Sequence, residues 1–78
     1  MANTKFEEIR KDAATSQFIK WCEGLKSWEK CFYVNKIALA CDVSYVTVMR
    51  WSYGYGRIRK PYYSIINEIA GEEVIKMS

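Results

Sequence analysis

Histidine is absent from this chain of 78 residues, and cysteine occurs only three times. Structural zinc sites require four nitrogen or sulfur ligands, usually in pairs at short spacing. Cys22, Cys31 and Cys41 are too few and too widely spaced, so we expect no metal and interpret them as free thiols in a reducing cytosol. Without a histidine or a paired carboxylate, Glu23 and Glu29 do not form an acid–base pair. We therefore expect no catalytic residues, no cofactor and no enzymatic activity.

Long hydrophobic runs are also missing. No stretch of 18 apolar residues is present, and the first residues do not follow the charged, apolar and small-residue order of an export signal. We therefore expect a cytoplasmic protein without a membrane partner. Half of the residues are hydrophobic and 15% are aromatic, so residues 1–78 suffice for a single domain with a compact core. A domain of this size buries its surface only marginally, and dimerisation would help.

Acidic residues are missing from the whole segment 43–67. The same segment contains Arg50, Arg57, Arg59 and Lys60, whereas the first 42 residues carry seven bases and six acids, which nearly cancel. The net charge of +3 is therefore concentrated in one part of the chain. This distribution predicts a local positive potential at which a polyanion would bind.

Helical periodicity and turn residues predict an all-α fold, a small bundle of four to five helices. The segment Lys26–Val34 is harder to assign because Cys31–Val34 has a strand-like composition, and we predict a connector that is partly helical. Asn35 is a favourable N-cap for the next helix, and Pro61 suits the first turn of the last helix, which Gly71 ends. The predicted helices are Lys5–Leu25 (either straight or kinked near Ala14–Ser16), Lys36–Cys41, Tyr45–Tyr53 and about 61–70.

Several apolar positions outside the middle of the chain also carry predictions. Trp21 and Trp28 are interpreted as core anchors, because large aromatic side chains dominate small cores. We expect Arg57–Lys60 to form an exposed basic linker. The apolar residues of the C-terminal tail either seal the core or meet a partner subunit: Val74, Ile75 and Met77.

The segment 37–51 predicts two short helices joined by a tight turn. Asp42 tolerates the left-handed backbone conformation of such a turn, and the Ser44 hydroxyl can cap the amides of a second helix. Val48 and Trp51 lie three residues apart on one face of that helix, which we expect to pack on the first helix. This pattern is typical of a helix-turn-helix, about residues 35–53. The inner side of the first helix carries Ile37, Ala38 and Cys41.

The opposite side of the second helix is unusual for a solvated surface. At 100° per residue it holds Val46, Met49, Arg50 and Tyr53, where Glu, Lys or Gln would be ordinary. A structural helical hairpin explains the inner face but not this outer one. Methyl groups beside an arginine suit a DNA major groove, where they can contact thymine methyls and guanine. A protein-binding groove would use the same residues.

The segment resembles the helix-turn-helix of Cro-type phage repressors and related bacterial transcriptional regulators. Ala38 fills the small-residue position where the two helices touch, Val43-Ser44 opens the second helix, and Thr47-Val48-x-Arg50-Trp51 matches its usual run. Downstream, the residues from Pro61 to Gly71 look like the following helix of short Cro proteins. One departure is Asp42, which stands where the family usually has glycine. The resemblance covers roughly residues 35 to 71.

The resemblance implies a sequence-specific double-stranded-DNA-binding regulator, a repressor of phage or mobile-element type, in the bacterial nucleoid or a phage-infected cell. A homodimer would place its second helices in successive major grooves about 34 Å apart on a near-palindromic operator. No small-molecule ligand is evident. Among the residues, we expect a base-facing set and a phosphate-binding set. The base-facing set is Ser44, Tyr45, Val46, Met49, Arg50 and Tyr53. The phosphate-binding set is Thr47, Arg57, Arg59 and Lys60.

Two alternatives remain open on the sequence. The first is a protein-interaction module, such as an antitoxin-like or phage inhibitor protein that keeps the fold without reading DNA. Binding to protein that is insensitive to salt, with no binding to DNA, would favour it. The second is an architectural or recombination accessory protein, which binds DNA in order to bend it.

Overall fold

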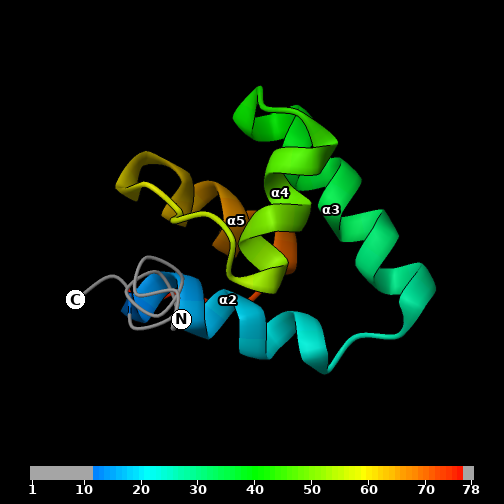
Figure 1. Cartoon of the computed structure of the whole chain (residues 1–78), viewed down its shortest axis with the longest axis horizontal. Coiled ribbons are helices and arrows are strands. Elements are labelled where there is room, and N and C mark those ends of the chain that lie inside the picture. The colour runs from blue at the N-terminus through cyan, green and yellow to red at the C-terminus, as the bar shows by residue number, and fades with distance from the viewer. Residues whose placement is uncertain (1–11, 77–78) are drawn as a thin grey trace, which may run out of the picture.

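The computed structural model describes residues 12–76. Within this range the chain is all-helical, which confirms the predicted fold class. Helix α4 packs against α2 and α3, and α5 packs against α3 (Figure 1). None of the described helices combines the length and the apolar character that a membrane crossing requires. The elements are α2 (Ala13–Glu23), α3 (Ser27–Cys41), α4 (Tyr45–Tyr53), the 3₁₀ helix η1 (Lys60–Tyr62) and α5 (Tyr63–Ala70).

Helix α2 begins at Ala13 because Asp12 has an extended backbone (φ −62°, ψ 121°). The Asp12 carboxylate accepts hydrogen bonds from the N–H of Thr15 at 3.1 Å and from its hydroxyl at 2.8 Å. Within the described residues the prediction of a helix over Lys5–Leu25 is therefore wrong at both limits: Asp12 is not helical, and α2 ends at Glu23, two residues before Leu25. The part of that prediction that precedes residue 12 lies outside the described residues.

Helix α3 differs most from the prediction. It is one continuous helix, Ser27–Cys41, so the connector over Lys26–Val34 and the N-cap at Asn35 are wrong. The Glu29 carboxylate accepts a hydrogen bond from the Lys26 backbone N–H at 3.0 Å and so supports the first turn. Burial of one face at helical spacing outweighs the strand propensity of the middle of the helix. The buried residues are Val34, Ile37, Ala38 and Cys41.

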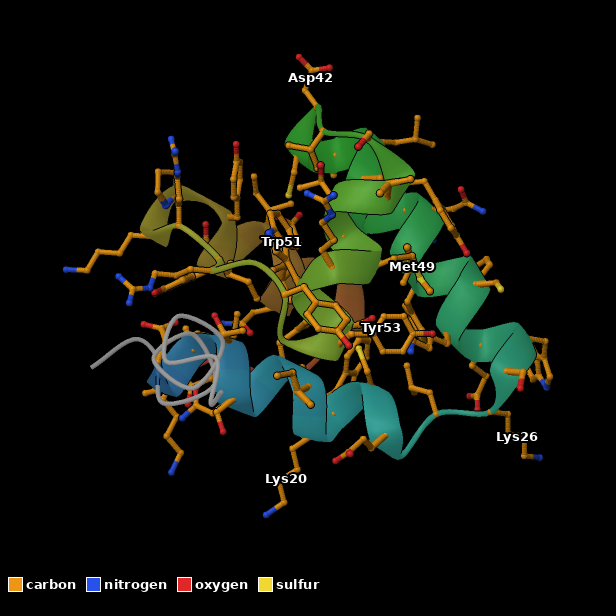
Figure 2. All side chains as sticks on the ribbon, viewed as in Figure 1. Lys20, Lys26, Asp42, Met49, Trp51 and Tyr53 are labelled. Atoms are coloured by element: carbon orange, nitrogen blue, oxygen red, sulfur yellow. The ribbon has the colours of Figure 1, made fainter. Side chains whose placement is uncertain are left out.

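The limits of the second half of the fold follow the predictions closely. Helix α4 spans Tyr45–Tyr53, as predicted, and Gly54 ends it with a φ of 82°. Pro61 lies in η1, which leads directly into α5, and Gly71 ends α5 with a φ of 74°. The turn between α3 and α4, marked by Asp42, forms one tip of the molecule (Figure 2).

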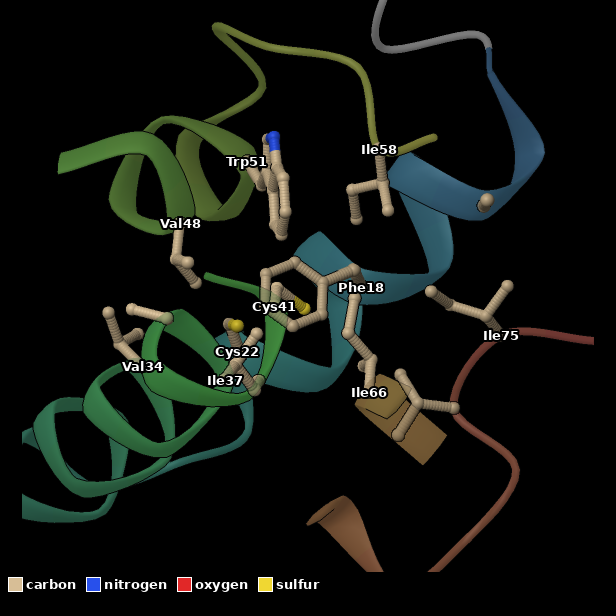
Figure 3. Packing of buried hydrophobic residues seen from close by; sticks show 13 residues of the cluster. Phe18, Cys22, Val34, Ile37, Cys41, Val48, Trp51, Ile58, Ile66 and Ile75 are labelled. Carbon is tan, nitrogen blue, oxygen red and sulfur yellow. The ribbon is translucent and has the colours of Figure 1, made fainter. Parts of the chain in front are cut away.

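The core draws on each of the four described α-helices, the loop after α4 and the C-terminal tail. Figure 3 shows Phe18 of α2 in the middle of the cluster, with Trp51 on one side and Ile66 on the other. Burial of such side chains is the main stabilising contribution in a chain of this size. The largest side chains that are fully buried are Phe18, Ile37, Ile58, Ile66, Ile75, Val34 and Val48.

Two sequence-based assignments of buried and exposed residues are wrong. Trp28 is not a core anchor, because its side chain is 68% exposed, whereas Trp21 packs against the core as predicted. The linker Arg57–Lys60 is not exposed throughout, because Ile58 is buried in the core. The backbone N–H of Ile58 also donates a hydrogen bond to the Thr15 hydroxyl at 3.2 Å, and this contact joins the loop to α2.

The C-terminal tail closes the core through a paired hydrogen bond. The Asn67 side-chain amide donates to the Ile75 carbonyl and its oxygen accepts from the Ile75 N–H, both at 2.8 Å. Val74 and Ile75 are buried, which agrees with the first of the two predicted roles, sealing the core. Met77, the third residue of that prediction, lies outside the described residues.

Replacing Asn67 by alanine removes both hydrogen bonds and leaves two backbone groups of buried Ile75 without partners. We expect Asn67→Ala to lower the free energy of unfolding by about 2–3 kcal/mol in urea titrations. Glu68→Ala, at the exposed neighbouring position, is the matched control and should have little effect. Equal midpoints for the two variants would show that this pair does not hold the tail.

Candidate nucleic-acid interface

The turn between α3 and α4 is built around one residue with a left-handed backbone. Asp42 has φ 56° and ψ 45°, the only positive φ at a non-glycine position within residues 12–76. The Val43 N–H donates to the Ala38 carbonyl at 3.0 Å, and the Asp42 N–H donates to the Leu39 carbonyl at 3.3 Å. These are the hydrogen bonds of a Schellman motif, in which glycine usually takes the left-handed position. The predicted positive φ of Asp42 is confirmed.

Ser44 begins α4. Its hydroxyl oxygen accepts a hydrogen bond from the Thr47 backbone N–H at 3.2 Å, which confirms the predicted N-cap. The Ser44 and Thr47 hydroxyls also lie 2.9 Å apart. Because one of them donates to the other, one hydroxyl hydrogen of the pair remains available to an outside acceptor.

The inner face of α4 is fixed by Val48 and Trp51, both buried as predicted. The Trp51 ring lies 5.4 Å from the Tyr62 ring, centroid to centroid. On the side of the loop, a Cβ placed on Gly56 would lie 3.3 Å from Trp51 Cδ1 and 3.7 Å from Arg50 Cβ. Contacts from several elements therefore fix the rotation of α4 about its own axis, and this rotation decides which residues face outward.

The outward side of α4 presents Val46, Arg50 and Tyr53, which we call the outer strip. Val46 is 60% exposed, Tyr53 is 51% exposed, and Arg50 is also exposed. Met49, predicted to belong to this side, is half-buried and packs against the core. Figure 2 shows its side chain pointing from α4 towards α3. The position lies about 60° around the helix from Val46, so the prediction that Met49 points fully outward is wrong.

Two contacts connect the exposed side of α4 to α3. The Lys30 ammonium lies 4.0 Å from the centroid of the Tyr53 ring, a cation–π contact. The Tyr45 hydroxyl donates a hydrogen bond to Cys31 Sγ at 3.7 Å, and this bond raises the pKa of the Tyr45 hydroxyl, which remains a neutral donor. Lys30 was not predicted from the sequence because its segment was not assigned to a helix. A helical assignment of residues 27–41 would have placed Lys30 one turn before Val34, on the side that meets the other helices.

The basic loop after α4 is anchored at its centre. Ile58 is buried, while Arg57, Arg59 and Lys60 on either side of it are exposed. Arg57 Nε lies 4.0 Å from an oxygen of Asp12, and the arginine side chain is 60% exposed. Such a solvated ion pair adds little stability and leaves the guanidinium accessible. The loop therefore presents three cations from a short segment whose position is held by the core.

A hollow of about 450 Å³ opens between α2, α3 and α4 next to Tyr53. Its buried polar groups are occupied: the Ser52 hydroxyl donates to the Met49 carbonyl at 2.7 Å. Burial raises the pKa of the Cys22 thiol to about 12, so the thiol stays neutral. Within residues 12–76, no buried side-chain nitrogen or oxygen lacks a partner, and no three potential metal ligands are grouped. The lining residues are Ile19, Cys22, Glu23, Lys30, Ser52 and Tyr53.

No protein-family model matches the chain, and comparisons with curated proteins and with solved structures gave no match. The candidate site is therefore defined by its geometry alone. It combines the first turn of α4, the outer strip and the anchored cations of the loop. The predicted residues that α4 and its cap bring together are Ser44, Tyr45, Val46, Thr47, Arg50 and Tyr53, and those that the loop presents are Arg57, Arg59 and Lys60.

The left-handed turn gives a direct test of this geometry. Asp42→Gly should raise the free energy of unfolding by about 0.5–1 kcal/mol, because glycine has no Cβ to oppose a positive φ. Asp42→Val should lower it by about 1 kcal/mol or more, because a branched side chain opposes that conformation. Urea titrations measure both values. If the valine variant is as stable as the glycine variant, the backbone at this position is not left-handed.

Proposed function

We propose that this chain is a sequence-specific regulator that binds double-stranded DNA by inserting α4 into the major groove. The observation that carries the proposal is the outer strip, Val46, Arg50 and Tyr53, on a helix whose rotation is fixed by its buried face. A helix about 10–12 Å wide with its side chains fits a groove about 12 Å wide. An exposed valine side chain makes no hydrogen bond with water. In the major groove it can contact thymine methyl groups, and the arginine beside it can donate hydrogen bonds to guanine acceptors.

Within the groove, the residues of α4 would make different kinds of contact. Arg50 would bind guanine through two hydrogen bonds or hold a phosphate, and Val46 would contact a thymine methyl. Ser44 and Tyr45 would lie at the entrance of the helix, where backbone N–H groups also face the DNA. Met49 is half-buried, so only the exposed part of its side chain would reach a thymine.

Phosphate contacts would lie on both flanks of α4. On the side of α3, the Lys30 ammonium packs on the face of the Tyr53 ring, so the ammonium and the Tyr53 hydroxyl are presented next to each other. On the other flank, Thr47 and the anchored basic loop would face the second strand. No acidic residue occurs in segment 43–67, so this surface carries positive charge that carboxylates within the segment do not offset. The cations of the loop are Arg57, Arg59 and Lys60.

As a regulator, two copies would read a near-palindromic operator, with the two α4 helices in major grooves about 34 Å apart. Binding at a promoter would block RNA polymerase, so repression is the regulatory outcome that we propose, without a cofactor. A DNA-bending accessory protein would show the same contacts but a strongly bent complex. The other alternative is a protein-interaction module. It is favoured by three exposed apolar residues of α3, which are Trp28, Phe32 and Leu39.

Arg50→Ala tests base reading. Arg50 is exposed, so the variant should fold as the wild type does. If Arg50 reads a base, binding to a duplex selected from a random pool should weaken by about 1–3 kcal/mol, and the preference at one base pair should relax. Titrations against the selected duplex and its single-base variants measure both effects.

The matched control is Lys20→Ala, which removes one positive charge from the side of α2 that points away from α4 (Figure 2). It should reduce affinity only slightly and leave every base preference unchanged. If Arg50→Ala and Lys20→Ala bind all duplexes alike, α4 does not read bases.

Neutralising the loop tests the phosphate contacts. The triple variant Arg57→Gln, Arg59→Gln, Lys60→Gln should weaken binding to all sequences alike. It should also reduce the slope of log affinity against log salt by about 0.9 for each phosphate that the loop no longer binds.

The control for this triple variant has the same net charge but replaces exposed lysines elsewhere: Lys20→Gln, Lys26→Gln, Lys76→Gln. It should retain most of the wild-type slope. If the slope falls equally in the two triple variants, binding responds to net charge and the basic loop is not a specific phosphate site.

A further inference from the structure

Helix α3 has a second apolar face that no described part of the chain covers. Trp28, Phe32 and Leu39 are 68%, 50% and 83% exposed. They share one side of the helix, opposite the face that buries Ile37 and Cys41. Figure 1 shows α3 along one edge of the molecule, with its outer side unobstructed. We call these three residues the α3 strip.

The α3 strip is large for a chain of this size. A complete aromatic side chain offers about 150–250 Å², so the three residues together expose on the order of 400 Å². The largest apolar patch on a typical monomer has about this extent and is often functional. We propose that the α3 strip is the surface through which a second copy of this chain binds. The inference rests on the proposed function in one respect, since reading a palindromic operator requires two copies.

The pattern of the strip is self-complementary. In a two-fold, antiparallel pairing of α3 helices, Trp28 of one copy meets the partner's Leu39, so that a large flat side chain packs on a branched one. Phe32 then lies near the two-fold axis, beside the partner's Asn35. The side-chain amides of the two Asn35 residues can form a hydrogen bond with each other. Each apolar residue of the strip meets a residue on the same side of the partner's α3, which is the requirement for an isologous interface.

The polar groups beside the strip favour a second copy over insertion into lipid. The Lys36 ammonium lies 4.8 Å from the centroid of the Phe32 ring, so a cation lies beside the strip, and Asn35 adds an amide on the same side. Insertion into lipid would bury both polar groups without partners. In the antiparallel pairing, Lys36 lies on the same flank as the partner's Glu29 and at nearly the same level, so opposite charges meet at the solvated rim. No like charges face each other.

The area also predicts the strength of the interaction. A standard interface buries about 800 Å² on each partner, roughly twice the apolar area of the strip. We therefore expect a weak dimer, with a dissociation constant in the micromolar range or above, that is completed when two copies bind one DNA site.

Sedimentation equilibrium without DNA, from about 1 µM to about 1 mM protein, tests the inference. The wild type should pass from monomer to dimer over this range. Leu39→Glu should weaken dimerisation by at least about tenfold, because two carboxylates would enter the interface. Ala40→Glu is the matched control: it adds the same side chain at the next, exposed position of α3, outside the strip, and should dimerise as the wild type does. Thermal unfolding of both variants checks that they fold.

Three outcomes would overturn the inference. These are a wild type that stays monomeric throughout, equal weakening by both variants, or binding of the monomer to vesicles of anionic phospholipid that Leu39→Glu abolishes. The proposed function fails separately. If the wild type dimerises through the strip but binds no duplex DNA, the second-copy contact stands and DNA binding is wrong.

Discussion

The burial of Val48 and Trp51 fixes the rotation of α4, and the assignment of every other residue of that helix depends on this rotation. With these two side chains buried, Val46 and Arg50 face outward and Met49 lies on the flank of α3. The rotation is robust because Trp51 contacts Tyr62 beyond the loop as well as the helices beside it. A helix held in this way can present side chains to a rigid partner with little loss of backbone conformational entropy on binding.

The cations of the loop gain their position from a second, smaller set of contacts. Thr15 is fully buried, and its hydroxyl donates to Asp12 and accepts from the Ile58 N–H, so one side chain joins the start of α2 to the loop. Because Ile58 is also part of the core, the arginines beside it are displayed from a fixed backbone. The loop is therefore held in position by α2, which contributes no residue to the candidate interface.

The sequence predicted well where a local residue decides the conformation. Asp42, Ser44 and Gly54 gave the turn and both ends of α4, because positive φ and capping hydrogen bonds depend on neighbouring residues. The sequence predicted poorly where distant contacts decide. The first half of α3 has strand-like residues that become helical because the other helices cover its inner face, and the burial of Ile58 depends on α2. Trp28 was misplaced because large aromatic side chains serve cores and contact surfaces equally well.

The central claim is that the outer strip of α4 enters the major groove, and amide chemical-shift mapping tests it most directly. The ¹⁵N-labelled chain would be titrated with a duplex selected from a random pool, and the perturbed amides placed on the structure. We predict that the largest changes fall on residues 44–53 and 57–60, with a smaller change at Lys30 and little change along the outer side of α2. Changes confined to the α3 strip, or none at any duplex concentration, would contradict the claim.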